Sequence, residues 1–319
     1  MFQQKISLVI PVRDEAATIA TLFESIGRQT LAPDEVVIVD GGSTDGTPEL
    51  ITRQVLRRSE VRLIRTDGAS PGKGRNLGIK AARNEWIALT DAGISLEDDW
   101  LDQLAAAAAD ADYVQGDVIP ITTTFFTKCA AMAYVPAAFN GAVRGRFIAS
   151  SMIRKEAWAA VGGFPDLRAA EDLIFIENLK TAGFRFADAP MAVVHWQLRP
   201  DIASTFRRFM LYSKHNVWAG RQWDWHYGIL RQYALLVPVL AAAALHSLWW
   251  LVLLPLWLAA RTAKRVLPFR SEFGLAWILN PFAFAFTAFL LLVLDLATFA
   301  GWIQAAINGK PASGKFSAE

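Results

Sequence analysis

Two kinds of hydrophobic pattern alternate along the N-terminal two-thirds of the chain. Short runs rich in β-branched residues predict buried strands. The segments between them carry apolar residues every three or four positions, as Ala16–Gln29 does, and this spacing predicts helices that bury one face. Further helices are expected at Glu49–Leu56, after Thr47-Pro48, and at Leu96–Ala109. The predicted strands are Lys5–Val12, Glu35–Asp40, Val61–Thr66, Glu85–Thr90 and Ala111–Val118.

Strand–helix alternation of this kind predicts an α/β fold with an open, mainly parallel sheet and helices on both faces. Ligands in such folds bind beyond the carboxyl ends of the strands. Four consecutive strand ends lead here into charged residues or glycine turns, which indicates one polar site at a shared edge. Independent turns and helix caps are the alternative. The four segments are Pro11–Glu15, Asp40–Gly46, Gly72–Gly78 and Thr90–Gly93.

Several residues of these segments suit the binding of a phosphorylated nucleotide. Asp40 closes an apolar strand and could accept bonds from a ribose or a base, or form an Asx turn. The Gly72–Gly78 loop resembles a phosphate cradle, although it matches neither standard glycine motif. Arg75 and Asn76 are candidates for a diphosphate or sugar contact, or simply the start of a helix. Asp91, at the tip of a buried strand, suits a hard divalent cation that bridges two phosphates.

The order of these motifs resembles that of family 2 glycosyltransferases, which have the GT-A fold. Two later motifs agree, a Gly-Gly-Phe-Pro segment and a Glu-Asp pair. Each motif is weak by itself, but their common order across residues 5–210 is specific. The matching segments are Pro11-x-x-x-Glu15, Val39–Thr47, Gly72-x-x-Arg75-Asn76-x-Gly78, the Asp91 turn, Val161–Pro165 and Glu171-Asp172.

The resemblance implies a membrane-anchored enzyme that transfers a sugar from a nucleotide donor with inversion. Asp172, beside Glu171, would be the base that deprotonates the acceptor hydroxyl. A divalent cation, Mn²⁺ or Mg²⁺, would be held by Asp91 and His195. A UDP-sugar is the expected donor, with GDP-mannose the recurrent exception in the family. The residues implied in donor binding are Pro11, Arg13, Glu15, Asp40, Arg75, Asn76, Asp91 and Arg208.

Departures from the family pattern leave alternatives open. Asp91-Ala92-Gly93 lacks the second carboxylate of an Asp-x-Asp metal motif. Thr205–Phe209 lacks the Gln and Trp of Gln-x-x-Arg-Trp, which argues against a processive polysaccharide synthase. Acidic residues also favour helix starts, and His195 could be an ordinary structural histidine. The rival functions are a catalytically degenerate membrane scaffold and a nucleotidyltransferase on the same fold.

The C-terminal third is apolar enough to enter a membrane. The chain is 53% hydrophobic and 19% charged, and its apolar excess follows residue 231. Gln232–Ala260 carries no Lys, Arg, Asp or Glu, and Phe273–Ile307 carries only Asp295. Both stretches exceed the roughly 20 residues that a span needs. We therefore predict a glycosyltransferase domain at residues 1–225 and a membrane-anchoring helical segment at residues 226–319.

Basic residues between the two apolar stretches bear on topology. The positive-inside rule would place them in the cytoplasm, which requires the first stretch to turn back near His246-Ser247 as a hairpin. A multi-pass arrangement is the alternative. The N-terminus has no signal-peptide pattern and Cys129 has no partner for a disulfide, so we expect a cytoplasmic catalytic domain on the inner or plasma membrane. The expected partners are the donor, a lipid-linked or glycan acceptor and membrane lipids; a net charge of +2 does not indicate nucleic acid.

Overall fold

The computed structural model describes residues 4–138 and 142–310, which form two compact units. The first unit holds residues 4–121 and 142–197 and contains the sheet. The second holds residues 122–138 and 198–310 and is helical. The assignment of catalysis to residues 1–225 and of anchoring to residues 226–319 stays a prediction.

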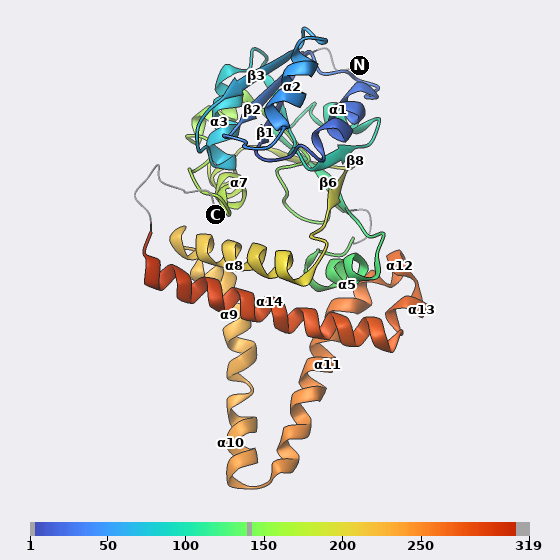
Figure 1. Cartoon of the computed structure of the whole chain (residues 1–319), viewed down its shortest axis with the longest axis vertical. Helices are drawn as coiled ribbons and strands as arrows, with labels where there is room; N and C mark the ends of the chain where they lie inside the picture. Colours follow the sequence, from blue (N-terminus) through green and yellow to red (C-terminus); the bar gives the residue numbers. More distant parts are fainter. Residues whose placement is uncertain (1–3, 139–141, 311–319) are drawn as a thin grey trace. The chain divides into compact units, whose positions relative to one another are not determined.

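An eight-stranded sheet forms the centre of the first unit (Figure 1). Several of its strands are continuous apolar runs, as expected where helices cover both faces of a sheet. In chain order the strands are β1 (Ile6–Val12), β2 (Glu35–Asp40), β3 (Val61–Arg65), β4 (Trp86–Leu89), β5 (Ile94–Leu96), β6 (Tyr113–Ile121), β7 (Ser151–Arg154) and β8 (Phe186–Gln197).

The direction of the strands decides where their carboxyl ends lie. The sheet has the order β3-β2-β1-β4-β7-β6-β8-β5. Strands β3, β2, β1 and β4 pair in parallel, β7 is antiparallel to both β4 and β6, and β8 is parallel to β6. Strand β5, at the end of the order, is antiparallel to β8. All strands of the sheet except β7 and β5 therefore point the same way and end at one edge. This is the open α/β sheet that the sequence predicts.

Each face of the sheet has its own hydrophobic core. Leu8 and Val9 are neighbours in β1, yet they belong to opposite cores because side chains alternate along a strand. The core around Leu8 includes Phe23 and Trp100 from α1 and α4, and the core around Val9 includes Phe175 from α7. The helices of this unit are α1 (Ile19–Gly27), α2 (Thr47–Val55), α3 (Pro71–Ala81), α4 (Trp100–Ala107), α6 (Lys155–Ala160) and α7 (Glu171–Thr181).

Some local expectations need correction. Each predicted strand overlaps a strand of the structure, but β5 and β7 are not predicted, because runs of three and four residues give almost no period to detect. The predicted helix at Leu96–Ala109 begins only at Trp100, since Ile94–Leu96 pairs with β8. In α2 the capping position is Gly46 rather than Thr47, a shift of one residue.

The second unit is a helical assembly in which α14 is the longest element (Figure 1). It packs closely against α8, because a Cβ at Gly301 would lie 2.2 Å from the Met210 carbonyl oxygen. Phe286 of α14 also contacts the ring of Phe125 in α5, with ring centroids 5.5 Å apart. The elements are α5 (Phe125–Tyr134), α8 (Ile202–Trp218), α9 (Gln222–Ala234), α10 (Val237–Leu245), η1 (Leu248–Val252), α11 (Leu253–Val266), η2 (Leu267–Phe269), α12 (Arg270–Phe273), α13 (Leu275–Ile278) and α14 (Pro281–Asn308).

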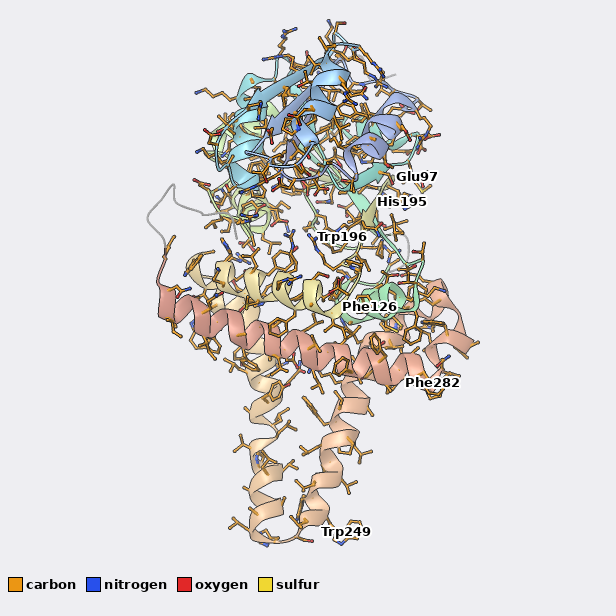
Figure 2. All side chains as sticks on the ribbon, in the orientation of Figure 1. Glu97, Phe126, His195, Trp196, Trp249 and Phe282 are labelled. Carbon is orange, nitrogen blue, oxygen red and sulfur yellow. The ribbon has the colours of Figure 1, made fainter. Side chains whose placement is uncertain are left out.

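The first apolar stretch forms a hairpin rather than one continuous rod. Helix α10 ends at Leu245, the side chain of Ser247 caps η1, and α11 returns beside α10, with Trp249 at the turn (Figures 1 and 2). Trp249 is 82% exposed, and large apolar side chains are exposed along the whole hairpin. Contiguous apolar surface of this extent is typical of a membrane or partner surface.

Two helices in the described residues are long and apolar enough to cross a membrane, Gln222–Leu245 and Pro281–Asn308. They differ in burial: 6% of the most apolar window is buried in the first and 56% in the second. The second helix therefore packs largely within its own unit. The hairpin is the segment that leaves its apolar surface exposed.

Asp295 is the acidic residue that interrupts the second apolar stretch, and the sequence predicts that it faces protein, water or a headgroup. It is buried on α14 and accepts hydrogen bonds from Arg261 of α11 (Nη2–Oδ1, 2.7 Å) and from the Tyr233 hydroxyl of α9 (2.9 Å). A charge removed from water is tolerated only when it is paired in this way. The pairing joins α9, which leads into the hairpin, and α11, its returning arm, to α14.

Candidate active site

Hydrogen bonds join the loops that follow β1 and β2. The N–H of Asp14 donates to Ser43 Oγ (2.9 Å), and the Asp14 carboxylate accepts from the N–H of Thr44 (2.7 Å). The N–H of Glu15 donates to Thr47 Oγ1 (2.8 Å). Asp14 has a φ of 53°, a left-handed conformation that these bonds hold in place. Two of the predicted segments thus form one fixed edge of the site.

Asp40 ends β2 and is fully buried. Its Oδ1 accepts hydrogen bonds from the N–H (2.9 Å) and the hydroxyl (2.7 Å) of Ser43, so the Asx turn is present. Within the described residues its Oδ2 has no hydrogen-bond partner, although Arg65 Nε lies 3.5 Å away. One oxygen of this carboxylate therefore remains able to accept a bond from a ligand.

The centre of the site is a set of four charged side chains, Arg75, Asp91, Glu171 and Asp172, which we call the Arg75 cluster. Arg75 projects from α3 and is 3% exposed. Its Nη2 donates to Asp91 Oδ1 (2.6 Å) and its Nη1 donates to Glu171 Oε1 (2.9 Å). A planar guanidinium can bridge two carboxylates in this way, whereas an ammonium group cannot. Arg75 thus links the fourth strand end to the start of α7.

The acidic pair at the start of α7 is electrostatically strained. Burial raises the pKa of Glu171 to about 7; the neighbouring Asp172 adds to this shift and Arg75 opposes it. Burial also raises the pKa of Asp172, against the opposing effect of Arg75, and Asp91 contributes in the same direction as burial. Glu171 is 6% exposed, whereas Asp172 is only partly buried. Of the two, Asp172 is the carboxylate that a substrate can reach.

The backbone before this pair is also unusual. Ala170 precedes Glu171 with a φ of 68°, in the left-handed region that a residue with a Cβ rarely occupies. Such conformations cost about 1–3 kcal/mol and cluster at functional sites. The strained residue sets the direction in which α7 begins, and therefore where Glu171 and Asp172 lie.

The glycines of the Gly72–Gly78 segment serve close packing. A Cβ at Gly72 would lie 2.4 Å from the Pro165 carbonyl oxygen, and one at Gly78 would lie 2.4 Å from Val9 Cγ1. A Cβ at Gly74 would lie 3.2 Å from the Cβ of Pro11. The segment is helix α3 pressed against β1 and the Gly-Gly-Phe-Pro loop, and this contact explains its glycines better than a phosphate cradle does.

Asn76 supports that same loop. Its Nδ2 donates to the Phe164 carbonyl oxygen (2.8 Å), and its Oδ1 accepts from the N–H of Phe164 and from Trp158 Nε1, both at 2.9 Å. Both ends of the amide are therefore engaged within the protein. Its predicted contact with the donor stays a prediction, and the bonds seen here indicate a structural role.

The two predicted metal ligands have different surroundings. Asp91 is 40% exposed at its side chain and keeps one oxygen beyond the bond to Arg75, which fits a cation shared with the phosphates of a donor. His195 Nε2 instead lies 2.5 Å from Glu97 Oε1, as Figure 2 shows for the two side chains. In residues 4–138 and 142–310, no three His, Cys, Asp or Glu side chains are grouped to hold a metal ion. The roles of Asp91 and His195 as metal ligands both stay predictions, and the contact with Glu97 gives His195 a partner within the protein.

The remaining predicted donor residues divide between the two units. Pro11 lies in β1, and Arg13 and Glu15 follow that strand. The Arg13 guanidinium is 3.7 Å from Asp14, while Glu15 lies against the turn after β4, where its Oε2 is 3.5 Å from the position of a Cβ on Gly93. Arg208 belongs to α8 of the helical unit, where its Nε donates to the Tyr212 hydroxyl (2.8 Å).

Three polar residues around the site are missed by the sequence analysis. Glu97 bonds His195, Trp158 bonds Asn76, and Asp166 accepts a hydrogen bond from the Ser70 hydroxyl at the start of α3 (2.5 Å). Trp158 and Asp166 flank the Gly-Gly-Phe-Pro segment, and this position is the one signal that could have indicated them. Glu97 follows a strand too short to be predicted.

Comparison with known proteins agrees with this geometry. Residues 7–155 match the family described as glycosyl transferase family 2. This segment is therefore a family 2 glycosyltransferase domain. That domain contains the loops after β1 and β2, Arg75 and Asp91, whereas Glu171 and Asp172 follow the matched segment.

The curated relatives of this glycosyltransferase domain differ in how far they align. The chain is 28% identical over 283 residues to the succinoglycan biosynthesis protein ExoA of Rhizobium meliloti, covering 79% of this chain and 82% of ExoA. It is 35% identical over 124 residues to a PGL/p-HBAD biosynthesis glycosyltransferase of Mycobacterium bovis, covering 37% of this chain and 48% of that protein. It spans 30% of EpsH of Bacillus subtilis, at 32% identity over 105 residues and 33% of this chain.

A solved structure has the same fold. The mannosyltransferase PcManGT from Pyrobaculum calidifontis, in complex with GDP-Man and Mn²⁺, superposes with a TM-score of 0.64 at 19% sequence identity. The match covers 96% of this chain and 88% of the mannosyltransferase. At that identity the likeness establishes the GT-A fold alone.

Proposed function

We propose that the chain transfers a sugar from a nucleotide-sugar donor to a hydroxyl group of a lipid-linked or glycan acceptor, with inversion. The observation that carries the proposal is the Arg75 cluster at the carboxyl edge of the sheet, within and beside the family 2 domain. In this cluster one buried arginine holds two carboxylates and leaves a third, Asp172, partly accessible.

Asp172 is the proposed base. A carboxylate with a raised pKa accepts a proton more readily than an ordinary one, and burial raises the pKa of Asp172. In the proposed step the acceptor oxygen attacks the anomeric carbon while the bond from that carbon to the diphosphate oxygen breaks. The hydroxyl proton passes to Asp172. Glu171 is bound to Arg75, and its proposed role is to position the cluster.

The donor would lie across the loops after β1, β2 and β4. Asp40 Oδ2 is buried without a hydrogen-bond partner in the described part of the chain, which supports a contact with the base or ribose. Pro11, Arg13 and Glu15 border the same edge. Arg75 and Asp91 would face the diphosphate, while Asn76 and Arg208 remain candidates. A UDP-sugar is the proposed donor; a GDP-sugar is the alternative to test first, because the mannosyltransferase of this fold was solved with GDP-Man.

A divalent cation, Mn²⁺ or Mg²⁺, belongs to the proposal. Asp91 would share it with the donor phosphates through the oxygen that Arg75 leaves free. When bound, such a cation supplies positive charge that stabilises the departing diphosphate. The mannosyltransferase of the same fold was solved with Mn²⁺, which supports including this cation in the test.

The exposed hairpin supports a membrane location. We propose that α10, η1 and α11 enter the cytoplasmic face of the inner or plasma membrane and keep the catalytic unit on the cytoplasmic side. Anchoring of this kind raises the local concentration of an acceptor that is itself held in the membrane.

The test is release of nucleoside diphosphate by the detergent-purified chain. UDP-, GDP- and dTDP-sugars are supplied in turn with membrane lipid extract, in the presence of Mn²⁺, Mg²⁺ or EDTA. We expect release from one donor, and we expect Asp172→Asn to lower it by about 100-fold or more, because the variant lacks the base. Asp91→Ala should abolish the dependence on metal together with most of the activity.

The matched control is Asp98→Asn, which removes a carboxylate from an exposed ion pair with Arg28 at 2.9 Å and should leave turnover unchanged. Release of pyrophosphate in place of nucleoside diphosphate would identify a nucleotidyltransferase. No turnover of any donor would contradict the proposal and favour the membrane scaffold.

A further inference from the structure

A cavity of 510 Å³ lies in the helical unit, at the base of the exposed hairpin. It is lined by α5, α8, α9, α11 and α14, and three cationic side chains of α11 border it, those of Arg261, Lys264 and Arg265. The rest of the lining is mostly aromatic and aliphatic. The cavity therefore combines a charged end with hydrocarbon walls.

Two of the three cations are not neutralised by the carboxylates that line the cavity. Asp295 is paired with Arg261 (Nη2–Oδ1, 2.7 Å), and Asp224 lies 3.6 Å from Arg221. Within the described residues, neither Lys264 nor Arg265 has a carboxylate within ion-pair distance. The cavity therefore carries an excess of positive charge.

Arg265 is held in place without a counter-ion. Its Nε donates to the carbonyl oxygen of Ala133 at the end of α5 (2.8 Å), which leaves the two terminal nitrogens of the guanidinium available. Basic residues in the last turn of a helix also favour the helix dipole, but that interaction does not require a partly buried side chain. A partly buried guanidinium without a carboxylate is energetically costly unless an anion joins it.

A third group in the same cavity lacks a partner. The Oε1 of Gln232 is buried and has no hydrogen bond in the described residues. The oxygen and nitrogen of a side-chain amide exchange places by a 180° flip, so Gln232 can present its NH₂ group to an anion. Gln232, Lys264 and Arg265 together form a set of donors suited to phosphate oxygens.

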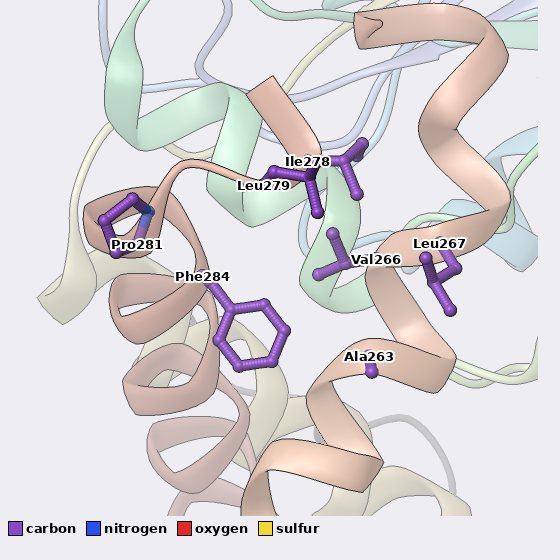
Figure 3. A pocket seen from close by; sticks show the side chains of 7 residues that line it. All are labelled: Ala263, Val266, Leu267, Ile278, Leu279, Pro281 and Phe284. Atoms are coloured by element: carbon purple, nitrogen blue, oxygen red, sulfur yellow. The ribbon is translucent and has the colours of Figure 1, made fainter. Parts of the chain in front are cut away.

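A neighbouring groove differs from the cavity in the residues that line it. The groove has a volume of 300 Å³, and only apolar side chains line it (Figure 3). Ala263 and Val266 of α11 belong to it, while Lys264 belongs to the cavity. Successive helical positions point about 100° apart, so α11 presents different faces to the two. The polar donors specify an anion in the cavity, and the apolar hairpin beside it specifies a lipid.

We propose that this cavity binds the phosphate headgroup of an anionic membrane lipid, with Lys264 and Arg265 as its counter-ions. The headgroup lies at the base of the hairpin, and the acyl chains follow the exposed apolar side chains of α10 and α11. This site is separate from the Arg75 cluster and does not depend on the proposed transfer reaction.

The test uses the full chain in a neutral detergent, titrated with dioctanoyl phosphatidic acid and followed by native mass spectrometry. We expect one saturable lipid, bound about tenfold or more weakly by Lys264→Gln, because a hydrogen bond to a charged group contributes about 1.5–3 kcal/mol. Lys264 is exposed and has no protein partner within the described residues, so this variant should fold normally. Combining it with Arg265→Gln should remove saturable binding.

The matched control is Arg270→Gln, which removes the same charge from an exposed residue of α12 that does not line the cavity. If this control binds the lipid as the wild type does, the result supports the site. A loss of affinity equal to that of Lys264→Gln would mean that the lipid is attracted by the overall positive charge of the protein and not by the cavity. Phosphatidylcholine carries the same phosphate but no net charge. Equally tight binding of dioctanoyl phosphatidylcholine would therefore show that the negative charge of the headgroup is not recognised, and would contradict the proposal. Displacement of the lipid by inorganic phosphate at equal concentration would show that the cavity binds a free anion rather than a lipid.

Discussion

At the scale of single residues, Arg75 balances charges that would otherwise repel one another. Asp91, Glu171 and Asp172 bring three carboxylates together, and the buried guanidinium hydrogen-bonds the first two. It does not fully offset their burial, because the pKa of Glu171 still rises to about 7. The folded protein therefore favours the protonated form of Glu171 more than the unfolded chain does, and its stability should depend on that proton.

The expected consequence is a stability difference that changes with pH. The pKa of Glu171 is raised from 4.5 to about 7, so its stabilising contribution is complete below the lower value and is lost as pH rises through the upper one. Glu171→Gln mimics the protonated form and keeps an acceptor for Arg75. From about pH 5 to pH 8, the Tm of the wild type should fall by about 5 °C relative to the variant.

Thermal melts of both proteins at matched ionic strength measure this difference. Glu60→Gln, at an exposed position, serves as the control and should follow the wild type at every pH. Parallel curves for the wild type and Glu171→Gln would mean that Glu171 titrates normally.

The sequence identifies all four members of this cluster but not how they are connected. Asp91, Glu171 and Asp172 are found because they stand at a strand end and a helix start, positions that a one-dimensional pattern can indicate. The bonds of Arg75 span 16 and 96 positions along the chain, and only the folded sheet brings these groups together. Asn76 shows what the pattern leaves out, since its hydrogen bonds to Phe164 and Trp158 also appear only in the folded structure, while its contact with the donor stays a prediction.

At the scale of secondary-structure elements, α3 owes its position to glycines. Gly78 faces Val9 and Val39 with no room for a methyl group, because a Cβ would lie 2.4 Å from Val9 Cγ1. Gly228 is also helical, in α9, yet a Cβ there would meet no atom within 4 Å. The two glycines have the same cost in helix propensity and opposite packing surroundings.

Gly78→Ala should therefore destabilise the protein by about 1–3 kcal/mol, since overpacking outweighs the gain in propensity. Gly228→Ala should stabilise its helix by about 0.5–1 kcal/mol, because only the propensity term remains. Denaturant unfolding followed by circular dichroism measures both. A stabilising Gly78→Ala would show that α3 moves away from β1 at little cost, and the packing role of that glycine would then be wrong.

Elements are predicted well where one physical signal dominates. Strands β1, β2 and β4 are found because burial on both faces makes them largely apolar, a pattern that requires no tertiary information. Strands β5 and β7 are missed because they exist through pairing with β8, β4 and β6 rather than through their own short sequences. The start of α4 is displaced for the same reason.

At the scale of the whole molecule, hydropathy locates the apolar segments but does not determine their path. Gln232–Ala260 is long enough for a span, yet it turns at His246 and returns as α11. Pro281–Asn308 is more apolar still, yet more than half of its most apolar window is buried in the helical unit. Packing of α14 against α8 and α5 accounts for its burial, and the bond between Asp295 and Arg261 joins α14 to α11 at the base of the hairpin.

The hairpin gives a decisive prediction about topology. If both arms begin and end on one side of the membrane, Arg231 in α9 and Arg270 in α12 lie on the same side, whereas a single crossing by Gln232–Ala260 would separate them. The chain has one cysteine, Cys129, which is buried, so Cys129→Ser gives a background without thiols. Both arginines are exposed and suit replacement by cysteine one at a time.

A membrane-impermeant maleimide should label Arg231→Cys and Arg270→Cys to the same extent in inside-out vesicles, and neither in right-side-out vesicles. The reason is that the hairpin returns the chain to its starting face, with positive charge kept in the cytoplasm. Thr52→Cys, in the exposed part of α2, reports the side of the catalytic unit and should behave identically. Labelling of the two arginine positions from opposite faces would mean that Gln232–Ala260 crosses the membrane once and is not a hairpin. The proposed position of the lipid cavity at the membrane surface would then be wrong as well.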